Sequence, residues 1–225
     1  MNQFHPVSHL KRFSRTAQGF TLIEILIVVT ILALLLSLTA NISQGVVDSM
    51  NFRQAIQNLK GKMESARQTA ITTNRTILVR LVKGKDELGN EIWNGVQIGH
   101  AEIITDPADD NYAPPVAGNF TPKFIPADPV ERLPLGLAFH DSPEFSSLLS
   151  DLEGITHGTT TNEGGLTESY ASFVFQPDGR CALTINEAWT LTVIKQEDLQ
   201  ASELPPDYVT LQLDPRTART RIYRR

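Results

Sequence analysis

One carboxylate lies inside an otherwise apolar segment near the start of the chain. Residues 20–40 (FTLIEILIVVTILALLLSLTA) carry a single charged side chain, that of Glu24. A helix over such a segment is roughly 30 Å long, the thickness of the hydrocarbon core of a bilayer. A carboxylate at that depth costs about 2.5–3.5 kcal/mol on insertion scales, so it normally persists only where it has a partner. Glu24 is therefore the first candidate functional residue.

The residues before the apolar segment orient it. Residues 1–19 contain no acid and three bases, Lys11, Arg12 and Arg15. The positive-inside rule places this leader in the cytoplasm and everything after Ala40 on the far side of the membrane. Three interpretations compete: a secretory signal peptide cut near Ala40, a plain signal anchor in which Glu24 is incidental, and a segment in which the acid has a function.

The string GFTLIE at residues 19–24 resembles the type IV prepilin signal, which type IV pilins and type II secretion pseudopilins share. The resemblance implies that a prepilin peptidase cuts between Gly19 and Phe20 and methylates the new amine of Phe20. It also implies that Glu24 pairs with the Phe20 amine of a neighbouring subunit during assembly. This pairing is chemically reasonable, because a buried carboxylate needs a cation and the chain supplies one at its own cleaved end.

An amphipathic pattern follows the apolar segment. Apolar residues recur at helical spacing at Phe52, Ile56, Leu59, Met63, Ala66 and Ala70. This periodicity predicts one helix from about Phe20 to Thr73, with a transmembrane half at 20–40 and an amphipathic half at 41–73. We expect the apolar stripe of the second half to pack on a soluble domain, and a coiled-coil partner is the alternative.

Strand patterns dominate the rest of the chain, so residues 74–225 are predicted to form an antiparallel β-rich domain. Residues 76–82 and 92–100 flank a polar turn and predict a hairpin. Further strands are predicted at 135–139, 171–175, 182–185, 189–194, 209–213 and 220–223. A loop-rich insertion is expected at about 101–170, which includes a Gly/Thr-rich stretch at 154–168. The fold class is then α+β.

Motifs of common enzymes are absent from the sequence. The chain has no GxSxG, HExxH, Walker A or GxGxxG string, and His100, His140 and His157 are scattered. His140-Asp141-Ser142 contains the residue types of a hydrolase triad, but three adjacent residues do not create triad geometry. We therefore expect a protein that is not an enzyme and needs no cofactor.

Two other features have an ordinary and a functional interpretation. Oxygen-bearing side chains gather at Asp106, Asp109, Asp110 and Asn111. Their spacing does not match an EF-hand, so a solvated acidic loop is expected rather than a calcium site, and no metal site is predicted. Cys181 is the only cysteine, which excludes an intrachain disulfide. It is expected to be a small buried apolar residue, and a redox role is the alternative.

Charge is distributed unevenly along the chain. The net charge is −5, yet the last ten residues contain no acid and five arginines: Arg216, Arg219, Arg221, Arg224 and Arg225. The leader is also basic, which leaves the body of the chain strongly acidic. The arginine tail could bind DNA phosphates, form a solvated edge strand, or meet the acidic body of a neighbouring subunit.

Two C-terminal strings indicate which subgroup of prepilin-like proteins this chain resembles. FVFQPDGR at 173–180 and VTLQLDPRTARTRIY at 209–223 are similar to the F-x-P-x-G element and the closing strand-turn-strand of H-type pseudopilins and FimT-like minor pilins. The T-G-R-like turn of these proteins has a glycine that this chain lacks at Arg216-Thr217-Ala218-Arg219.

The resemblance implies a pilin-like fold and a minor pseudopilin, a structural subunit of a type II secretion system engaged in protein transport. It would be a single-pass inner-membrane protein with its C-terminal domain in the periplasm. Its partners would be prepilin peptidase, other major and minor pseudopilins, the inner-membrane assembly platform and membrane lipid. The alternative is a FimT-like minor type IV pilin involved in pilus assembly or DNA uptake, with DNA as a partner of the arginine tail.

Overall fold

The computed structural model describes residues 20–103, 107–108, 123–162, 164–201 and 203–224, and within 36–48 it describes the backbone alone. The chain divides into two units, residues 1–48 and 49–225. One helix, α1 (Leu22–Thr73), contributes to both units. The predicted helix over 20–73 is thus confirmed, with its first turn starting two residues later than expected.

The first unit contains the apolar start of α1. Large apolar side chains are exposed along it, including Phe20, Leu22, Ile23, Ile25, Leu26 and Ile27. None of the helical segments that the structure describes combines the length and hydropathy that crossing a membrane requires.

In the second unit, α1 ends in a left-handed residue. Asn74 has a φ of +51°, and the Arg75 N–H donates to the Ala70 carbonyl at 3.2 Å. This is the long hydrogen bond of a Schellman motif, which satisfies a carbonyl that the end of a helix otherwise leaves unpaired. The chain then reverses into the first strand.

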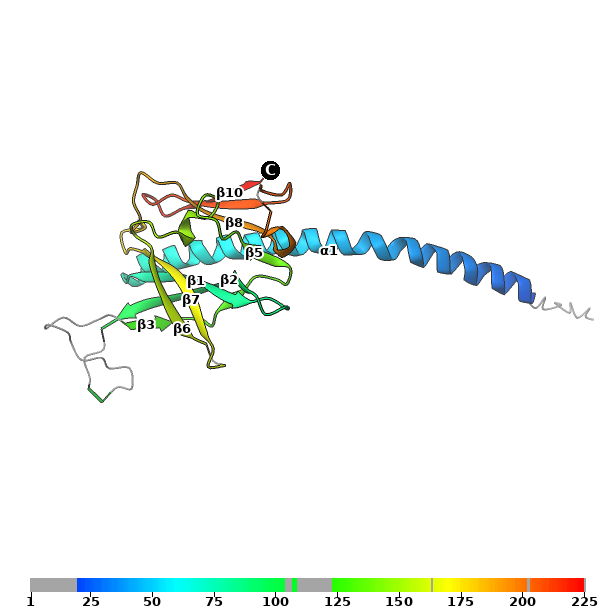
Figure 1. Cartoon of the computed structure of the whole chain (residues 1–225), viewed down its shortest axis with the longest axis horizontal. Helices are drawn as coiled ribbons and strands as arrows, with labels where there is room; N and C mark the ends of the chain where they lie inside the picture. Colours follow the sequence, from blue (N-terminus) through cyan, green and yellow to red (C-terminus); the bar gives the residue numbers. More distant parts are fainter. Residues whose placement is uncertain (1–19, 104–106, 109–122, 163, 202, 225) are drawn as a thin grey trace, which may run out of the picture. The chain divides into compact units, whose positions relative to one another are not determined.

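The described strands of the second unit form two antiparallel sheets (Figure 1). The large sheet has the order β3-β2-β1-β7-β6, with β4 paired to β2. Its strands are β1 (Ile77–Lys85), β2 (Glu91–Glu102), β3 (Lys123–Pro126), β4 (Glu131–Arg132), β6 (Thr156–Thr161) and β7 (Thr167–Phe175). The small sheet has the order β10-β9-β8-β5. Its strands are β5 (Leu137–Phe139), β8 (Trp189–Lys195), β9 (Val209–Leu213) and β10 (Thr220–Arg224). Two short 3₁₀ helices, η1 (Ser147–Leu149) and η2 (Gln196–Asp198), lie between strands.

The predicted hairpin is confirmed as β1 and β2. Its turn is closed by Asp86, whose carboxylate accepts hydrogen bonds from the N–H groups of Leu88 (2.9 Å) and Asn90 (2.7 Å). Gly89 has a φ of +86°, which a glycine adopts without strain. β1 also pairs with β7 on its other side, so β1 is the central strand of the large sheet.

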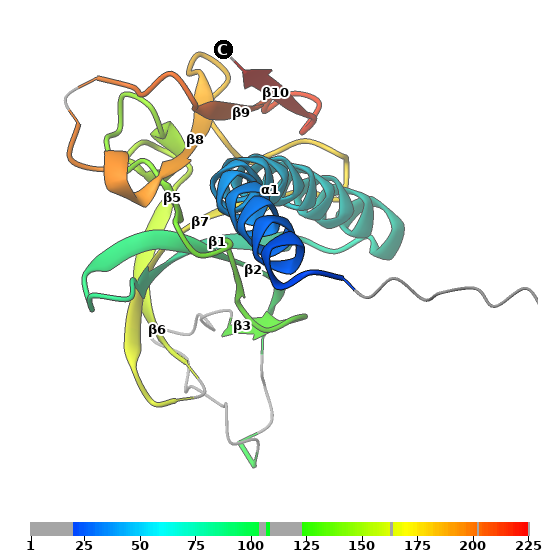
Figure 2. The same ribbon diagram turned by 90° about the vertical axis from the view of Figure 1, so that its right-hand side faces the viewer.

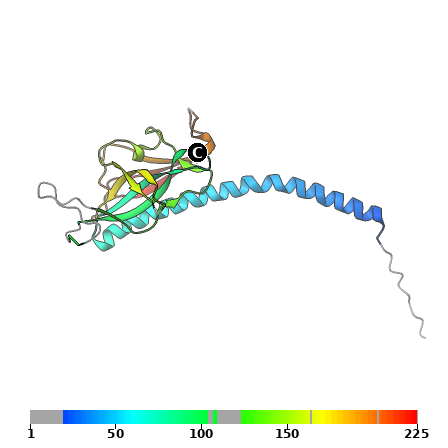
Figure 3. The same cartoon turned by 60° about the horizontal axis from the view of Figure 1, so that its bottom comes forward.

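The second half of α1 packs against both sheets. The predicted apolar stripe is buried in full: Phe52, Ile56, Leu59, Met63, Ala66 and Ala70. Figure 2 shows this cyan and teal part of the helix between the small sheet and β1, and Figure 3 shows it running along the strands of the large sheet. The predicted α+β class, with an N-terminal helix packed on an antiparallel β-rich domain, is therefore confirmed.

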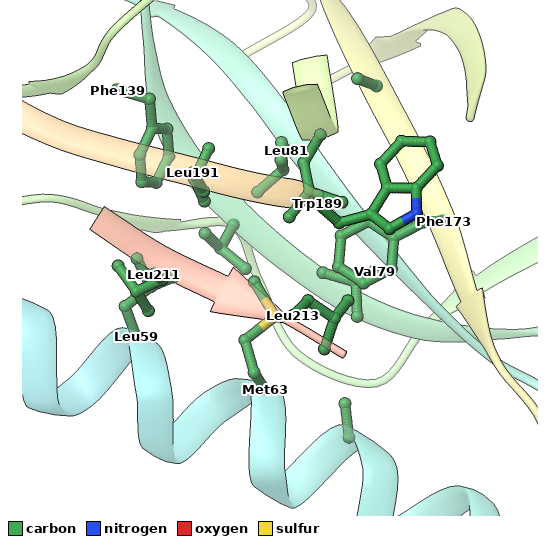
Figure 4. Close-up of a cluster of buried hydrophobic side chains, with 14 of the residues drawn as sticks. Leu59, Met63, Val79, Leu81, Phe139, Phe173, Trp189, Leu191, Leu211 and Leu213 are labelled. Atoms are coloured by element: carbon green, nitrogen blue, oxygen red, sulfur yellow. The ribbon is translucent and has the colours of Figure 1, made fainter. Parts of the chain in front are cut away.

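Aromatic and aliphatic side chains from three layers fill the core. Leu59 and Met63 point from α1 toward Leu211 and Leu213 of β9 (Figure 4). Behind them lie side chains with no exposed surface, including Trp189, Phe173, Val79, Leu81 and Leu191. A fully buried side chain of this size stabilises a fold by about 1.5–3 kcal/mol. The core thus fixes both sheets to the helix.

Three sequence predictions were wrong in detail. The Gly/Thr-rich stretch at 154–168, expected to be loop, contains β6. The expected loop-rich insertion also contains β3 and β4, which extend the large sheet at its other edge. Residues 182–185, expected to be a strand, form none; there the Ala182 N–H donates to the Val174 carbonyl.

Candidate functional site

The predicted assembly residue Glu24 lies in the first turn of α1. The Glu24 N–H donates to Oγ1 of Thr21 at 3.3 Å, and the Thr21 N–H donates to Oε2 of Glu24 at 3.4 Å. The Thr21 hydroxyl also donates to that carboxylate at 3.3 Å. This reciprocal pattern is a capping box, in which the N-cap residue and the residue three positions later satisfy each other's backbone donors.

The capping box gives Glu24 a local role within the single chain, where its side chain is exposed. A carboxylate also interacts favourably with the positive end of the helix dipole at this place. Pairing with an amine of a neighbouring chain is a property of an assembly, so it stays a prediction. Gly19 and the leader bases, which are Lys11, Arg12 and Arg15, lie outside the described residues.

The two C-terminal strings quoted above meet on the second half of α1. The first turns at Gly179, whose φ is +82°. A Cβ on Gly179 would lie 3.2 Å from Cδ1 of Ile71, so the turn sits directly on the helix. The next residues bring the strings together, because the Cys181 N–H donates to the Pro215 carbonyl at 2.9 Å.

The second string forms a tight turn between β9 and β10. The Asp214 carboxylate accepts hydrogen bonds from the Thr217 hydroxyl (2.9 Å) and the Arg216 N–H (3.0 Å). These hydrogen bonds, that of Thr217 first, hold the pKa of Asp214 below its ordinary value. Ala218 is fully buried and has a φ of +50°. The alanine that replaces the glycine of the T-G-R-like pattern therefore adopts a conformation that glycine favours.

Two side chains of α1 hold this turn, and we call them the helix clamp: Glu64 and Arg67. Oε1 of Glu64 accepts the N–H of Thr220 at 3.1 Å. Nε of Arg67 donates to the Thr217 carbonyl at 2.8 Å. Nη1 of Arg67 also lies 3.9 Å from Oε2 of Glu64. The clamp therefore binds backbone groups of the C-terminal turn rather than its side chains.

The arginine tail lies in β10, the edge strand of the small sheet, and in the turn before it. Four of its members are exposed: Arg216, Arg219, Arg221 and Arg224. Arg219 and Arg221 flank the buried Thr220, so both face solvent. None of the four forms an ion pair within 4.0 Å with a residue that the structure describes. Arg225 lies outside the described residues.

Residues 14–40 match the family model of the prokaryotic N-terminal methylation motif. The match includes the end of the leader, the expected cleavage point and Glu24. It supports a prepilin-like protein of the type IV pilin kind. The motif implies processing by a prepilin peptidase, assembly with other pilin-like subunits and anchoring of the N-terminal helix in the inner membrane. Neither the comparison with curated proteins nor that with solved structures found a match.

The triad-like string His140-Asp141-Ser142 forms a local turn. Nδ1 of the buried His140 accepts the backbone N–H of Ser142 at 3.1 Å. The imidazole packs edge-on against Phe145, with ring centroids 4.8 Å apart. The serine thus approaches the ring through its backbone rather than its hydroxyl. His100 and His157 lie elsewhere, on β2 and β6.

No group of three or more His, Cys, Asp or Glu side chains in the described part of the chain could hold a metal ion. The candidate calcium loop, Asp106, Asp109, Asp110 and Asn111, lies outside the described residues. Cys181 is buried and its thiol donates to the Val174 carbonyl at 3.1 Å. Burial raises the pKa of this thiol to about 12. It therefore stays a thiol at neutral pH, which disfavours a redox or nucleophilic role.

Two features escaped the sequence analysis. The capping box was readable as T-x-x-E at residues 21–24, but the acid was interpreted through membrane depth alone. The second is Arg80, which the sequence analysis did not single out within the strand predicted at 76–82. Its partners come from distant parts of the chain, so no local pattern marks it.

Proposed function

We propose that this chain is a minor pseudopilin of the H type in a type II secretion system. It is a structural subunit and not an enzyme. Together with major and minor pseudopilins it helps build the short pseudopilus that exports folded proteins across the outer membrane. The β-rich domain, residues 74–225, faces the periplasm.

Cleavage of the leader creates the amine that takes part in the assembly contact. The leader, residues 1–19, stays in the cytoplasm, where prepilin peptidase cuts between Gly19 and Phe20 and methylates the new amine. The transmembrane half of the helix, residues 20–40, then carries the Glu24 carboxylate and the Phe20 amine near one end. In an assembly Glu24 pairs with the amine of a neighbouring subunit, because an unpaired charge in apolar surroundings is costly. The inner-membrane assembly platform is the expected site of this step.

One observation carries the proposal: the methylation motif at residues 14–40 leads into a helix whose second half packs on a β-rich domain. The H-type assignment has a second support. The two strings that resemble this type lie together on α1 although residues 181–208 separate them in the sequence. This contact is consistent with the two strings forming one structural element, as the resemblance implies.

Mass spectrometry of the mature chain tests the maturation step. When the full chain is produced together with a prepilin peptidase, we expect loss of residues 1–19 and an N-methylated Phe20. A Gly19→Val variant is the control, because a side chain at the cleavage point should block the peptidase and keep the leader. A purified wild-type chain that still begins at Met1 would contradict the proposal.

The exposed arginines favour one other function, that of a FimT-like minor type IV pilin that binds DNA. In a gel-shift assay with the full chain in detergent, this function predicts salt-sensitive binding of duplex DNA. Changing Arg219 and Arg221 to Glu should then weaken binding at least about tenfold and lower the salt slope by about 2. Arg53→Glu with Arg75→Glu is the matched control, since it alters the net charge equally at two exposed positions elsewhere. Absence of binding at low salt removes this alternative.

A further inference from the structure

Arg80 lies at the centre of the large sheet, on the face turned away from the core. It stands on β1, opposite Gln97 of β2 and Ser172 of β7. Two aromatic rings enclose its guanidinium. The centroid of Phe124 lies 3.5 Å from Cζ of Arg80, and that of Tyr170 lies 4.1 Å from it. Both rings contact the guanidinium through cation–π interactions, so a further partner would bind it through its N–H groups.

This arginine lacks a counter-ion among the described residues. No described carboxylate lies within ion-pair distance of it, and its buried Nε has no hydrogen-bond partner in the described part of the chain. Burial lowers the pKa of the Arg80 guanidinium below its ordinary value, and the neighbouring Tyr170 opposes this only in part. An arginine remains charged even so, which makes an unpaired, half-buried one costly.

Arg132 beside it provides an internal comparison. Nη2 of Arg132 donates to both carboxylate oxygens of Glu168, at 2.7 and 2.6 Å, and Nη1 donates to Oδ1 of Asn94 at 2.9 Å. One arginine on this face therefore has a carboxylate and an amide oxygen as partners. Arg80 on the same face has two aromatic rings beside it and no acid among the described residues.

Glycines make room for these side chains. A Cβ on Gly99 would lie 2.5 Å from the Phe124 ring, and one on Gly158 would lie 2.6 Å from the Tyr170 hydroxyl. A Cβ on Gly95 would lie 2.7 Å from Nη1 of Arg132. Side chains at these positions would displace the rings and the guanidinium. The arrangement thus depends on the backbone of several strands and is more than a chance contact of surface residues.

A cavity of about 710 Å³ opens over this face. Its walls come from β1, β2, β3, β4 and β6 and from the segment before β4, and include Arg80, Gln97, Phe124, Pro129, Arg132 and Thr160. Figures 1 and 2 show β3 and β6 on the side of the large sheet that lies away from the small sheet. The volume is in the range of binding pockets. Its walls mix apolar side chains with polar ones, and Arg80 contributes a positive charge that has no counter-ion among the described residues.

We infer that this cavity binds an acidic side chain of a partner polypeptide, whose carboxylate pairs with the N–H edge of Arg80. A carboxylate is planar and accepts two parallel N–H bonds from such an edge. A polyanion fits less well, because Arg132 is already neutralised by Glu168 and Asp128 adds an acid to the cavity wall. The single uncompensated charge matches a single carboxylate. This docking site adds to the proposed assembly function and does not depend on it.

Fluorescence anisotropy with the full chain in detergent micelles tests the inference. The probe is a labelled peptide with blocked ends in which one Glu stands among Gly and Ser residues, and the same peptide with Gln in place of that Glu is its neutral counterpart. We expect binding of the Glu peptide alone at low salt. Arg80→Gln should weaken it about ten- to hundredfold, the range expected for loss of a charge-assisted pair. Arg53→Gln, which removes an exposed charge far from the cavity in sequence, should leave it unchanged.

A second variant keeps the test decisive if Arg80→Gln unfolds. Gln97→Glu places a carboxylate directly opposite Arg80 in the register, so it should pair with the guanidinium, raise the melting temperature and abolish binding of the Glu peptide. Unchanged binding by Gln97→Glu would overturn the inference, as would absence of Glu-peptide binding at low salt. Competition experiments distinguish an acidic polypeptide from a small carboxylate and from a nucleic acid. Displacement by an equal concentration of acetate, or by a single-stranded oligothymidylate, would overturn the assignment to a polypeptide.

Discussion

Replacing Glu24 with glutamine is expected to reduce incorporation of this chain into the assembled polymer at least tenfold and to leave cleavage after Gly19 intact. Glutamine keeps the size and the acceptor oxygen of the side chain but removes its charge. Breaking a buried pair by removing one partner costs about 3–5 kcal/mol, which is more than a hundredfold in an equilibrium constant. Incorporation is measured by quantitative immunoblotting of sheared polymer, and cleavage by the mass of the chain.

The capping box makes a matched control necessary, because Glu24 also stabilises the start of α1 within its own chain. Thr21→Ala removes the N-cap hydroxyl and keeps the acid. It should cost about 1 kcal/mol of helix stability and reduce incorporation only slightly. If capping were the whole role of Glu24, Thr21→Ala would lower incorporation as much as Glu24→Gln. Normal incorporation of Glu24→Gln would contradict the pairing outright.

The helix was the easiest element to predict, because its apolar stripe and its end signals lie in one continuous stretch. Every residue of the stripe from Phe52 to Ala70 is buried as expected. The start was placed at Phe20 rather than Leu22 because the apolar composition continues through Thr21, whereas the hydroxyl of Thr21 begins the helix as its cap. Periodicity identifies the buried face, but hydrogen-bonding side chains set the ends.

The strand errors have a different cause. β6 (THGTTT) is an edge strand with little buried surface, so it shows none of the apolar alternation that marks a half-buried strand. Its register comes from β7, which the sequence around 156–161 does not contain. At residues 182–185 a strand was predicted where none forms. The backbone of this stretch makes hydrogen bonds outside a sheet. The Thr184 carbonyl accepts the indole N–H of Trp189 at 2.7 Å.

The Arg80 cavity could not be predicted because it, too, depends on residues far away in the sequence. In the strand TILVRLV an arginine between apolar residues predicts a solvent-facing position, and the large sheet does turn it away from the core. Whether solvent or aromatic rings meet it depends on β3 and β7, which lie far along the chain. Cross-strand neighbours of this kind follow from topology and not from local pattern.

Loss of the helix clamp is expected to lower the stability of the second unit. Glu64→Ala is expected to destabilise the second unit by about 1–3 kcal/mol, because the Thr220 N–H would lose the carboxylate that accepts it in buried surroundings. In a domain of this size that corresponds to a melting temperature lower by about 2–12 °C. Glu64→Gln retains an acceptor oxygen and should cost less. Thermal unfolding of the full chain in detergent, followed by circular dichroism, measures these changes.

Two further variants separate the clamp from general surface effects. Arg67→Ala removes the bond to the Thr217 carbonyl, and since Glu64 and Arg67 hold one turn, the double variant should cost less than the two single changes added together. Thr220→Val is the control, because it keeps the N–H that Glu64 accepts and removes a buried hydroxyl without a partner among the described residues. Its stability should equal or exceed that of the wild type. Equal melting temperatures for Glu64→Ala and the wild type would mean that the core alone, without the clamp, fixes β10 and its arginines at the edge of the small sheet.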